Sequence, residues 1–348
     1  MAGPIGPAFF CSGHRAPQIP RNRATPMTSP FAYQRAASVE DALRRLAEPR
    51  TLPMGGGTDL LVTIDEGIYS PEAVVDLREV PASNSVELRD DGSLRIGGSA
   101  RIEHLSNHPL IRERYGVLAQ ACSVVATPAL REMGTLGGNL CQRPRCWYFR
   151  RGIACHKNGG DSCPARDAAG ENQYLAIVDG GPCYIVHPSD PAVALTALDA
   201  EVEIRSAKGE RVVAIEDFYL LPRERLDHET ILRPGEIVTA VLLPAAAGGG
   251  AQRYHKLMQR EAWDFALVSV AGCRRADGDV RIVLGGVAPR PWRVNSSVEE
   301  DVSSGGLDED TIATLAERAL YDAERLSKNG YKVELAQSLI RDVIREIG

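Results

Sequence analysis

The chain has 348 residues, of which 44% are hydrophobic and 25% are charged, and its formal net charge is −6. This composition is typical of a globular protein with room for two or three domains. The acidic balance argues against nucleic acid as the main partner, which would need a basic face, and no stretch reaches the roughly 18 apolar residues of a membrane span.

Residues 1–30 differ in composition from the rest of the chain. They contain four prolines before Thr25, scattered arginines and no apolar periodicity. A secretory signal needs an apolar run of about 7–15 residues, whereas here only Ala8 to Cys11 is apolar. We therefore expect a disordered leader without a secretory signal, and Met27 is a candidate for the true start of translation.

A small βαβ unit is expected from Phe31 to about residue 83. Ser38 to Asp41 has the form of a capping box before a short amphipathic helix. A strand signal, Arg50 to Met54, then runs into Gly55-Gly56-Gly57-Thr58-Asp59, and Ala73 to Leu77 predicts the next strand. Consecutive glycines between a strand and a helix let backbone N–H groups approach a phosphate, and we expect Thr58 to cap the helix. The run is neither a Rossmann fingerprint nor a Walker loop, and a flexible turn is the alternative interpretation.

Residues 84–246 predict a second subdomain. It begins with a hairpin from Ser85 to Ile96 that turns at Asp91-Gly92. One helical segment is expected from about Ile102 to Val125, followed by a second glycine motif, Gly134-Thr-Leu-Gly-Gly-Asn139. Strands are expected at Glu201–Arg205 and within Ile231–Leu243.

Five of the eight cysteines lie between Gly134 and Asp190. A loop of this length without apolar periodicity is uncommon unless it serves a function. We interpret residues 141–183 as an insert whose thiols replace the missing core. The candidate ligands, separated by 8, 7 and 19 residues, are Cys146, Cys155, Cys163 and Cys183.

Four cysteines in this spacing could hold an iron–sulfur cluster or zinc, form disulfides, remain free thiols, or be unrelated core cysteines. Structural zinc usually takes ligand pairs two to four residues apart, and this run has no Cys-x2-Cys pair. Two disulfides are an alternative, and an iron–sulfur cluster accepts irregular spacing. The neighbouring arginines favour the cluster, because positive charge offsets the negative charge of a thiolate-ligated centre. These are Arg143, Arg145, Arg150 and Arg151, for which a solvated basic face is the plainer interpretation.

A linker rich in alanine and glycine, Pro244 to Ala251, predicts a domain boundary. Beyond it, residues 247–348 predict an antiparallel pair from Ala266 to Gly285 that turns at Asp277-Gly278. Two amphipathic helices follow at about Asp308–Leu326 and Val333–Ile347.

Together, Met54 to Val62 and Gly134 to Leu140 resemble the FAD-binding medium subunit of the molybdenum hydroxylase (xanthine dehydrogenase) family, from roughly Phe31 to the C-terminus. Insertions similar to this cysteine insert hold a [4Fe-4S] cluster in the flavin subunits of bacterial aldehyde oxidoreductases and of 4-hydroxybenzoyl-CoA reductase. The phrase Arg145-Cys146-Trp-Tyr-Phe-Arg150 is more similar to the aldehyde oxidoreductase branch.

The resemblance implies an α+β fold. A two-subdomain, PCMH-type FAD-binding domain would occupy residues 31–246, with subdomains 31–83 and 84–246 and the iron–sulfur insert at 141–183. A small C-terminal domain of antiparallel sheet plus helices, similar to that of CO dehydrogenase flavoproteins, would occupy residues 247–348.

The resemblance also implies a role for individual residues. The first glycine loop would cradle the FAD pyrophosphate through Met54, Gly55, Gly56, Gly57, Thr58, Asp59, Leu60, Leu61 and Val62. Thr135, Gly138 and Asn139 would form a second flavin contact. Asp190 would bind the polar chain of the flavin, with a helix N-cap as its plainer interpretation, and Ile237 would pack near the adenine or the ring. Lys256 would lie close to the isoalloxazine, where a cation stabilises the reduced, anionic flavin, or is an ordinary solvated lysine. Cys146, Cys155, Cys163 and Cys183 would ligate the [4Fe-4S] cluster, with Cys141 as the substitute if Cys183 is too distant.

The implied function is electron transfer within a heterotrimer. A large molybdenum–molybdopterin subunit would oxidise an aldehyde, and electrons would pass through a small [2Fe-2S] subunit to FAD and then to an external acceptor. Alternatives are a complex like 4-hydroxybenzoyl-CoA reductase or xanthine dehydrogenase, a stand-alone flavin oxidoreductase, and a non-enzymatic metal or disulfide scaffold. Cluster thiols imply folding in the reducing cytoplasm, and co-export with a signal-bearing partner would allow a periplasmic location.

Overall fold

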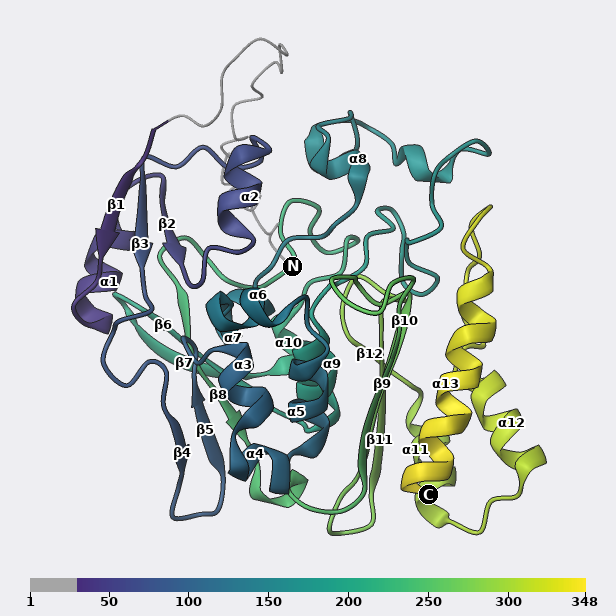
Figure 1. The fold of residues 1–348 in the computed structure, drawn as a ribbon. Helices are drawn as coiled ribbons and strands as arrows, with labels where there is room; N and C mark the ends of the chain where they lie inside the picture. The colour runs from purple at the N-terminus through teal and green to yellow at the C-terminus, as the bar shows by residue number, and fades with distance from the viewer. Residues whose placement is uncertain (1–29) are drawn as a thin grey trace, which may run out of the picture.

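The computed structural model describes residues 30–348, which form three β-sheets joined and covered by helices (Figure 1). The predicted leader lies outside the described residues, apart from Pro30. The mixed helix-and-sheet architecture confirms the predicted α+β class. None of the helices in the described part of the chain is both long and apolar enough to cross a membrane.

The first sheet is parallel and has the strand order β1-β3-β2. Its strands are β1 (Ala32–Arg35), β2 (Thr51–Met54) and β3 (Ala73–Asp76), with α1 (Val39–Leu46) and α2 (Leu60–Asp65) in the connections. The capping prediction for α1 is confirmed, because Ser38 Oγ accepts a hydrogen bond from Asp41 N at 3.1 Å. The prediction for α2 is wrong: Asp59, not Thr58, occupies its N-cap position, and no side chain caps the helix.

The second sheet is antiparallel, with the strand order β4-β5-β8-β6-β7. Its strands are β4 (Val86–Leu88), β5 (Leu94–Gly97), β6 (Glu201–Ser206), β7 (Gly209–Ala214) and β8 (Ile237–Leu243). The predicted hairpin is therefore present as β4 and β5, and β8 occupies the end of the apolar run predicted as a strand. This sheet shares the largest core with the central helices.

The central helices are shorter and more numerous than predicted. They are α3 (Ile102–Asn107), α4 (Pro109–Arg114), α5 (Gly116–Ser123), α6 (Pro128–Met133), α7 (Leu136–Leu140), α9 (Asp190–Ala197) and α10 (Ile215–Phe218). The single helix predicted over residues 102–125 is wrong, because Pro109 lacks an N–H and forces the preceding residue out of the helical region. His108 accordingly has φ −67° and ψ 124°. A second break falls at Tyr115, whose φ of −128° and ψ of 49° are not helical.

The cysteine insert is mostly irregular and lies above the central helices in Figure 1. It contains α8 (Trp147–Arg150) and two short 3₁₀ turns, η1 (His156–Asn158) and η2 (Pro164–Arg166). Its own buried core is small and consists of Ala165, Leu175 and Tyr184. The expected scarcity of apolar packing in the insert is thus confirmed.

The third sheet is antiparallel and has the strand order β12-β11-β10-β9. Its strands are β9 (Gln252–Leu257), β10 (Val268–Arg274), β11 (Val280–Gly285) and β12 (Trp292–Arg293), preceded by η3 (Ala245–Ala247). Helices α5 and α9 cover one face, and α13 (Tyr331–Ile347) covers the other (Figure 1). The remaining helices are α11 (Ser296–Ser304), which the sequence did not predict, and α12 (Glu309–Arg318). The domain boundaries themselves stay a prediction, and each sheet falls within one of the three predicted units.

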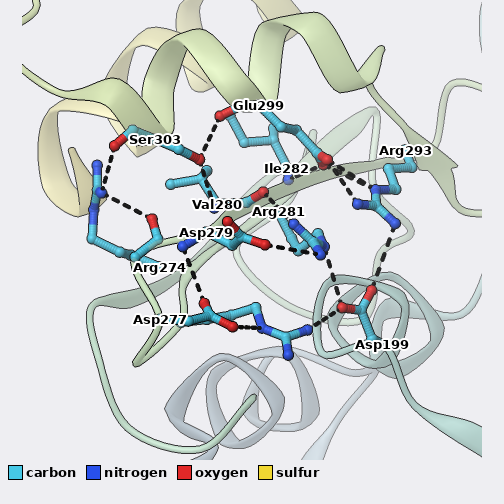
Figure 2. A network of polar contacts seen from close by, with 12 residues as sticks. Asp199, Arg274, Asp277, Asp279, Val280, Arg281, Ile282, Arg293, Glu299 and Ser303 are labelled. Carbon is cyan, nitrogen blue, oxygen red and sulfur yellow. Dashed lines mark hydrogen bonds and ion pairs between the residues drawn. The ribbon is translucent and has the colours of Figure 1, made fainter. Parts of the chain in front are cut away.

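Ion pairs centred on Asp199 connect the end of α9 to the third sheet (Figure 2). Asp199 pairs with Arg275, with Arg281 at 3.2 Å and with Arg293 at 3.6 Å. Arg293 also pairs with the buried Glu299 at 2.8 Å, and Glu299 accepts the backbone N–H of Ile282 at 2.9 Å. This network joins the C-terminal sheet to the rest of the molecule.

Candidate FAD site and cysteine cluster

The two glycine motifs pack against each other. A Cβ atom added to Gly56 would overlap the carbonyl group of Met133, and one added to Gly55 would overlap the side chain of Thr135. Gly57 has φ +73°, a conformation that favours glycine. The predicted glycine loops therefore need glycine here for close backbone approach as well as for turning.

A cavity of about 250 Å³ lies between these loops, and we call it the glycine cavity. Its walls contain backbone from both motifs together with the side chains of Thr135, Asn139, Arg143, Arg145 and Glu229. Of the predicted residues in the first loop, Gly55 to Leu60 line the cavity, whereas Leu61 and Val62 are exposed on α2 and Met54 is buried behind it. Backbone N–H groups beside glycines suit a pyrophosphate, which is rich in acceptor oxygens.

The second motif is a short helix, α7, that is connected to α9. Thr135 Oγ1 caps α7 by accepting a hydrogen bond from Gly138 N at 3.2 Å. Asn139 Oδ1 accepts a hydrogen bond from Ser189 Oγ at 2.5 Å, and Ser189 caps α9. The plainer interpretation of Asp190 as a helix N-cap is thus wrong, because Ser189 fills that position.

A second cavity, of about 370 Å³, has Asp190 in its wall together with Arg145, Cys146, His187 and Phe265, and we call it the Asp190 cavity. The Asp190 carboxylate accepts hydrogen bonds from Tyr254 Oη at 2.7 Å and from Lys256 Nζ at 2.8 Å. Burial raises the pKa of Asp190, and Lys256 holds part of that rise back. A buried carboxylate with two donors is a fixed acceptor site in this wall.

Lys256 is close to this cavity but is not in its wall. Its ammonium donates to Asp190, to Val124 O at 3.0 Å and to Asp264 O at 3.1 Å, and the side chain is 2% exposed. All three N–H donors are therefore used by the protein, and the interpretation as a solvated lysine is wrong.

Ile237 lies apart from the other predicted residues. It is the first residue of β8 and is 5% exposed, in the wall of a separate cavity of about 220 Å³ with Val39 and Leu77. The structure does not bring it to the glycine loops.

The arginines of the insert attach it to the first glycine loop. Asp59 accepts the backbone N–H of Arg143 at 2.8 Å and pairs with Arg145 at 3.0 Å and Arg150 at 2.9 Å. Arg150 also pairs with Glu66 at 2.8 Å. Carboxylates thus neutralise much of the positive charge that the sequence suggested for the cysteine cluster.

Glu229 is a site residue that the sequence did not reveal. It pairs with Arg143 at 2.6 Å and with Lys157 at 2.5 Å, and it lines the glycine cavity. Burial acts to raise the pKa of Glu229, but the two cations outweigh it and hold the pKa below its ordinary value. No local motif marks Glu229, because its partners are more than 70 residues away in sequence.

The four predicted cysteine ligands border one small cavity, the cysteine cavity. Its wall contains Cys146, Cys155, Cys163 and Cys183 together with Tyr148, Phe149, His156, Lys157, Leu175, Tyr184 and Ile185. Every cysteine within residues 30–348 is a free thiol, so this part of the chain contains no disulfide. Nor do three or more His, Cys, Asp or Glu side chains in the described residues converge in the manner of a single-ion site.

Backbone N–H groups act on two of these thiols. Those of Tyr148 and Phe149 favour a lower pKa for Cys146, and those of Lys157 and Asn158 favour a lower pKa for Cys155. Burial nevertheless raises the pKa of both thiols, and it raises that of Cys183 to about 12. These thiols therefore remain protonated at neutral pH unless a metal displaces the proton.

Cys141 is separate from this group. It is the C-cap residue of α7 and borders the glycine cavity. Because Cys183 reaches the cysteine cavity, Cys141 is not needed as its substitute.

Comparison with known proteins identifies the family. Residues 29–246 match the family described as "FAD binding domain in molybdopterin dehydrogenase". The chain belongs to the FAD-binding subunits of the molybdenum hydroxylases. Residues 253–347 match the CO dehydrogenase flavoprotein C-terminal domain, so the predicted family and its C-terminal domain are confirmed.

Individual flavoproteins are similar over nearly their full length. The aldehyde oxidoreductase FAD-binding subunit PaoB of Escherichia coli K12 is 35% identical, over 91% of this chain and 98% of the relative. The putative xanthine dehydrogenase FAD-binding subunit XdhB of the same organism is 26% identical, over 90% and 95%. The crystal structure of quinoline 2-oxidoreductase from Pseudomonas putida 86 shares the fold, with a TM-score of 0.70 at 24% identity over 92% of this chain and 97% of that one.

Proposed function

We propose that this flavoprotein is the electron-transfer subunit of a molybdenum-dependent aldehyde oxidoreductase and carries both FAD and a [4Fe-4S] cluster. Its partners would be a large molybdenum–molybdopterin subunit and a small [2Fe-2S] subunit, from which it would pass electrons to an external acceptor. The observation that carries this proposal is the gathering of four cysteines around one cavity beside the Asp190 cavity. The 35% identity to a relative named as an aldehyde oxidoreductase subunit supports the choice of complex.

FAD is proposed to occupy the glycine and Asp190 cavities. The pyrophosphate is proposed to lie in the glycine cavity, where backbone donors are available, and the isoalloxazine ring in the larger Asp190 cavity. Bound FAD supplies the ability to accept and release electrons. Thr135 and Asn139 would hold the pyrophosphate and Asp190 the isoalloxazine half of the cofactor, and Ile237 stays a candidate only for the adenine end.

The arrangement of the four cysteines favours an iron–sulfur cluster over zinc. A zinc ion needs its sulfur ligands at about 2.3 Å from one point, and within residues 30–348 no such group converges. A [4Fe-4S] cluster binds each thiolate at a different iron, so its ligands surround it. The backbone N–H groups at Cys146 and Cys155 would then donate to ligating sulfurs, which is one way proteins set a cluster potential.

The relative position of the cavities supports electron transfer between the two groups. Cys146 and Leu175 border both the cysteine cavity and the Asp190 cavity. The proposed cluster and flavin sites thus share two side chains. Electron transfer between them requires no general acid–base pair.

Iron and flavin analysis of the anaerobically purified complex tests the proposal. We expect one FAD and about four iron atoms beyond those of the [2Fe-2S] subunit, with an additional paramagnetic signal on reduction. Substituting Cys155→Ser should remove these four irons and that signal and leave FAD bound, whereas Cys273→Ser, a buried thiol outside the insert, should leave both cofactors unchanged. A complex with no iron beyond that of the [2Fe-2S] subunit, in which the thiols of the insert are bridged to one another, would overturn the proposal.

The substrate class is tested on the same complex. Acceptor reduction driven by aldehydes supports the proposed enzyme. Turnover of purines or of an aromatic CoA thioester would instead support the xanthine dehydrogenase-like or the 4-hydroxybenzoyl-CoA reductase-like alternative. Full activity of the isolated chain would indicate a stand-alone flavin oxidoreductase.

A further inference from the structure

We propose that Arg145 is a flavin-binding residue that contacts the N1–C2=O edge of the isoalloxazine ring and stabilises the negative charge of the reduced flavin. This inference rests on the placement of FAD across the glycine and Asp190 cavities. It assigns to the insert a role in the flavin site that is separate from its cysteines.

Arg145 lies at the junction of the two cavities proposed for FAD. Within residues 30–348, Arg145 is the residue whose side chain borders both the glycine cavity and the Asp190 cavity. In FAD, the ribityl chain joins the pyrophosphate to N10 of the ring, and N10 is next to N1 and C2=O. A group at the junction of the two cavities therefore lies where the ribityl chain meets that edge.

The neighbours of Arg145 fix the guanidinium at this junction. It pairs with Asp59 at 3.0 Å and donates to Gln142 Oε1 at 3.0 Å. The guanidinium carbon also lies 5.0 Å from the ring centroid of Phe265, which is in the wall of the Asp190 cavity. The side chain is held from the glycine loop on one side and by an aromatic ring on the other.

Arg145 differs from the neighbouring cations in how little of its charge is compensated by the protein. Lys256 is 2% exposed, and all three of its N–H groups donate to the protein. Arg150 is 7% exposed and pairs with two carboxylates. Arg145 is 29% exposed and shares the single charge of Asp59 with Arg150. Its positive charge is therefore the less compensated and the more accessible from the cavities.

The positive charge of Arg145 suits this role. Negative charge in reduced flavin concentrates near N1, and a cation there is one of the ways in which proteins tune a flavin.

The test compares Arg145→Gln with Arg145→Lys in the purified complex, by dye-linked redox titration of the flavin and by FAD dissociation. We expect R145Q to weaken the binding of reduced FAD about tenfold more than that of oxidised FAD. Tenfold corresponds to a midpoint potential lower by about 30 mV for a two-electron couple. R145K should restore most of the shift, because it keeps the charge. Arg112→Gln, an exposed arginine on α4, is the matched control and should leave the potential unchanged.

A flavin potential in R145Q equal to that of the unsubstituted chain would overturn the assignment. Gly56→Val separates this failure from failure of the FAD placement, because its side chain would enter the backbone contact between the two glycine motifs. If G56V loses FAD while R145Q behaves as the unsubstituted chain, the placement stands and the role of Arg145 is wrong. If folded G56V retains FAD with unchanged affinity, the placement itself is wrong.

Discussion

At the residue scale, the site contains buried polar groups whose partners come from distant parts of the chain. Asp59 belongs to the first glycine loop, yet its carboxylate binds the insert rather than capping α2. His187 is buried beside Tyr219 in the wall of the Asp190 cavity, with ring centroids 4.4 Å apart, and neither of its ring nitrogens has a hydrogen-bond partner within the described residues. Such groups make the site sensitive to protonation, because a buried charge without a partner is costly.

His187 leads to a prediction about pH. Burial lowers the pKa of His187 to about 4, while Glu229 acts to raise it and Arg145 to lower it. Between pH 6.5 and 4, the unfolded chain therefore binds a proton at His187 that the folded chain does not, and the free energy of unfolding falls as the pH falls. We expect this group to account for about 2 kcal/mol of the loss between pH 7.5 and pH 5.

Urea unfolding at the two pH values measures this effect. His187→Phe should lose about 2 kcal/mol less than the unsubstituted chain over the same interval. Tyr219→Phe keeps the aromatic neighbour of His187 and changes no group that titrates in this range, so its pH dependence should match that of the unsubstituted chain. Equal pH dependence in H187F would contradict the prediction.

At the element scale, short and long elements are held in different ways. The insert packs around a small core of three buried side chains, so ion pairs and hydrogen bonds to neighbouring elements fix its position. Helix α13, in contrast, buries an apolar face against the third sheet and belongs to the second-largest core. The two elements meet at Lys332, a fully buried residue of α13.

Lys332 leads to a prediction about this contact. Its ammonium nitrogen lies 2.9 Å from Tyr174 O in the insert and 2.7 Å from Gly286 O, and burial lowers the pKa of Lys332 to about 7. Lys332→Met should lower the free energy of unfolding by about 1–3 kcal/mol, because two buried carbonyl oxygens lose their donor. Chemical denaturation measures the loss. Lys328→Met, a partly exposed lysine paired with Glu171, is the control and should cost under about 1 kcal/mol. A cost for K332M as small as that of K328M would show that these carbonyls are satisfied in another way.

At the scale of the whole molecule, two features connect the C-terminal part to the rest. Helices α5 and α9 pack on one face of the third sheet. Asp199, at the end of α9, also forms ion pairs with arginines of that sheet (Figure 2). A Cβ atom added to Gly285 of this sheet would collide with Val193 of α9, so the apolar contact is close. Apolar packing therefore holds the third sheet against the rest of the molecule, and the ion pairs fix its orientation.

Asp199→Asn tests the contribution of the network. Asp199 has φ +49°, which asparagine tolerates, so the substitution removes charge without straining the backbone. Three arginines then lose a shared partner, and we expect the free energy of unfolding to fall by about 1 kcal/mol at low salt. The difference should shrink at 1 M salt, where the Debye length is about 3 Å. Asp277→Asn, which is more exposed, should have a smaller effect. A loss for D199N that is independent of salt would argue against an electrostatic origin.

The sequence by itself determined the class of the fold, the family and the candidate cofactor loops. Turn residues, apolar periodicity and the two glycine motifs are local signals, so Gly55 to Gly57, Thr135 and Asn139 were identified without coordinates. The sequence also contains Pro109, which ends the helix before it, although a single helix is predicted across this position.

The tertiary structure alone decided which charges meet. Asp59 with Arg145 and Arg150, Glu229 with Lys157, and Lys256 with Asp190 are pairs separated by 66 to 91 residues. Ion pairs between distant segments leave no periodic pattern, because each depends on how the chain folds back on itself. For the same reason, the sequence could propose four cysteine ligands, but only the fold brings them to one cavity and places Arg145 at the junction of the glycine and Asp190 cavities.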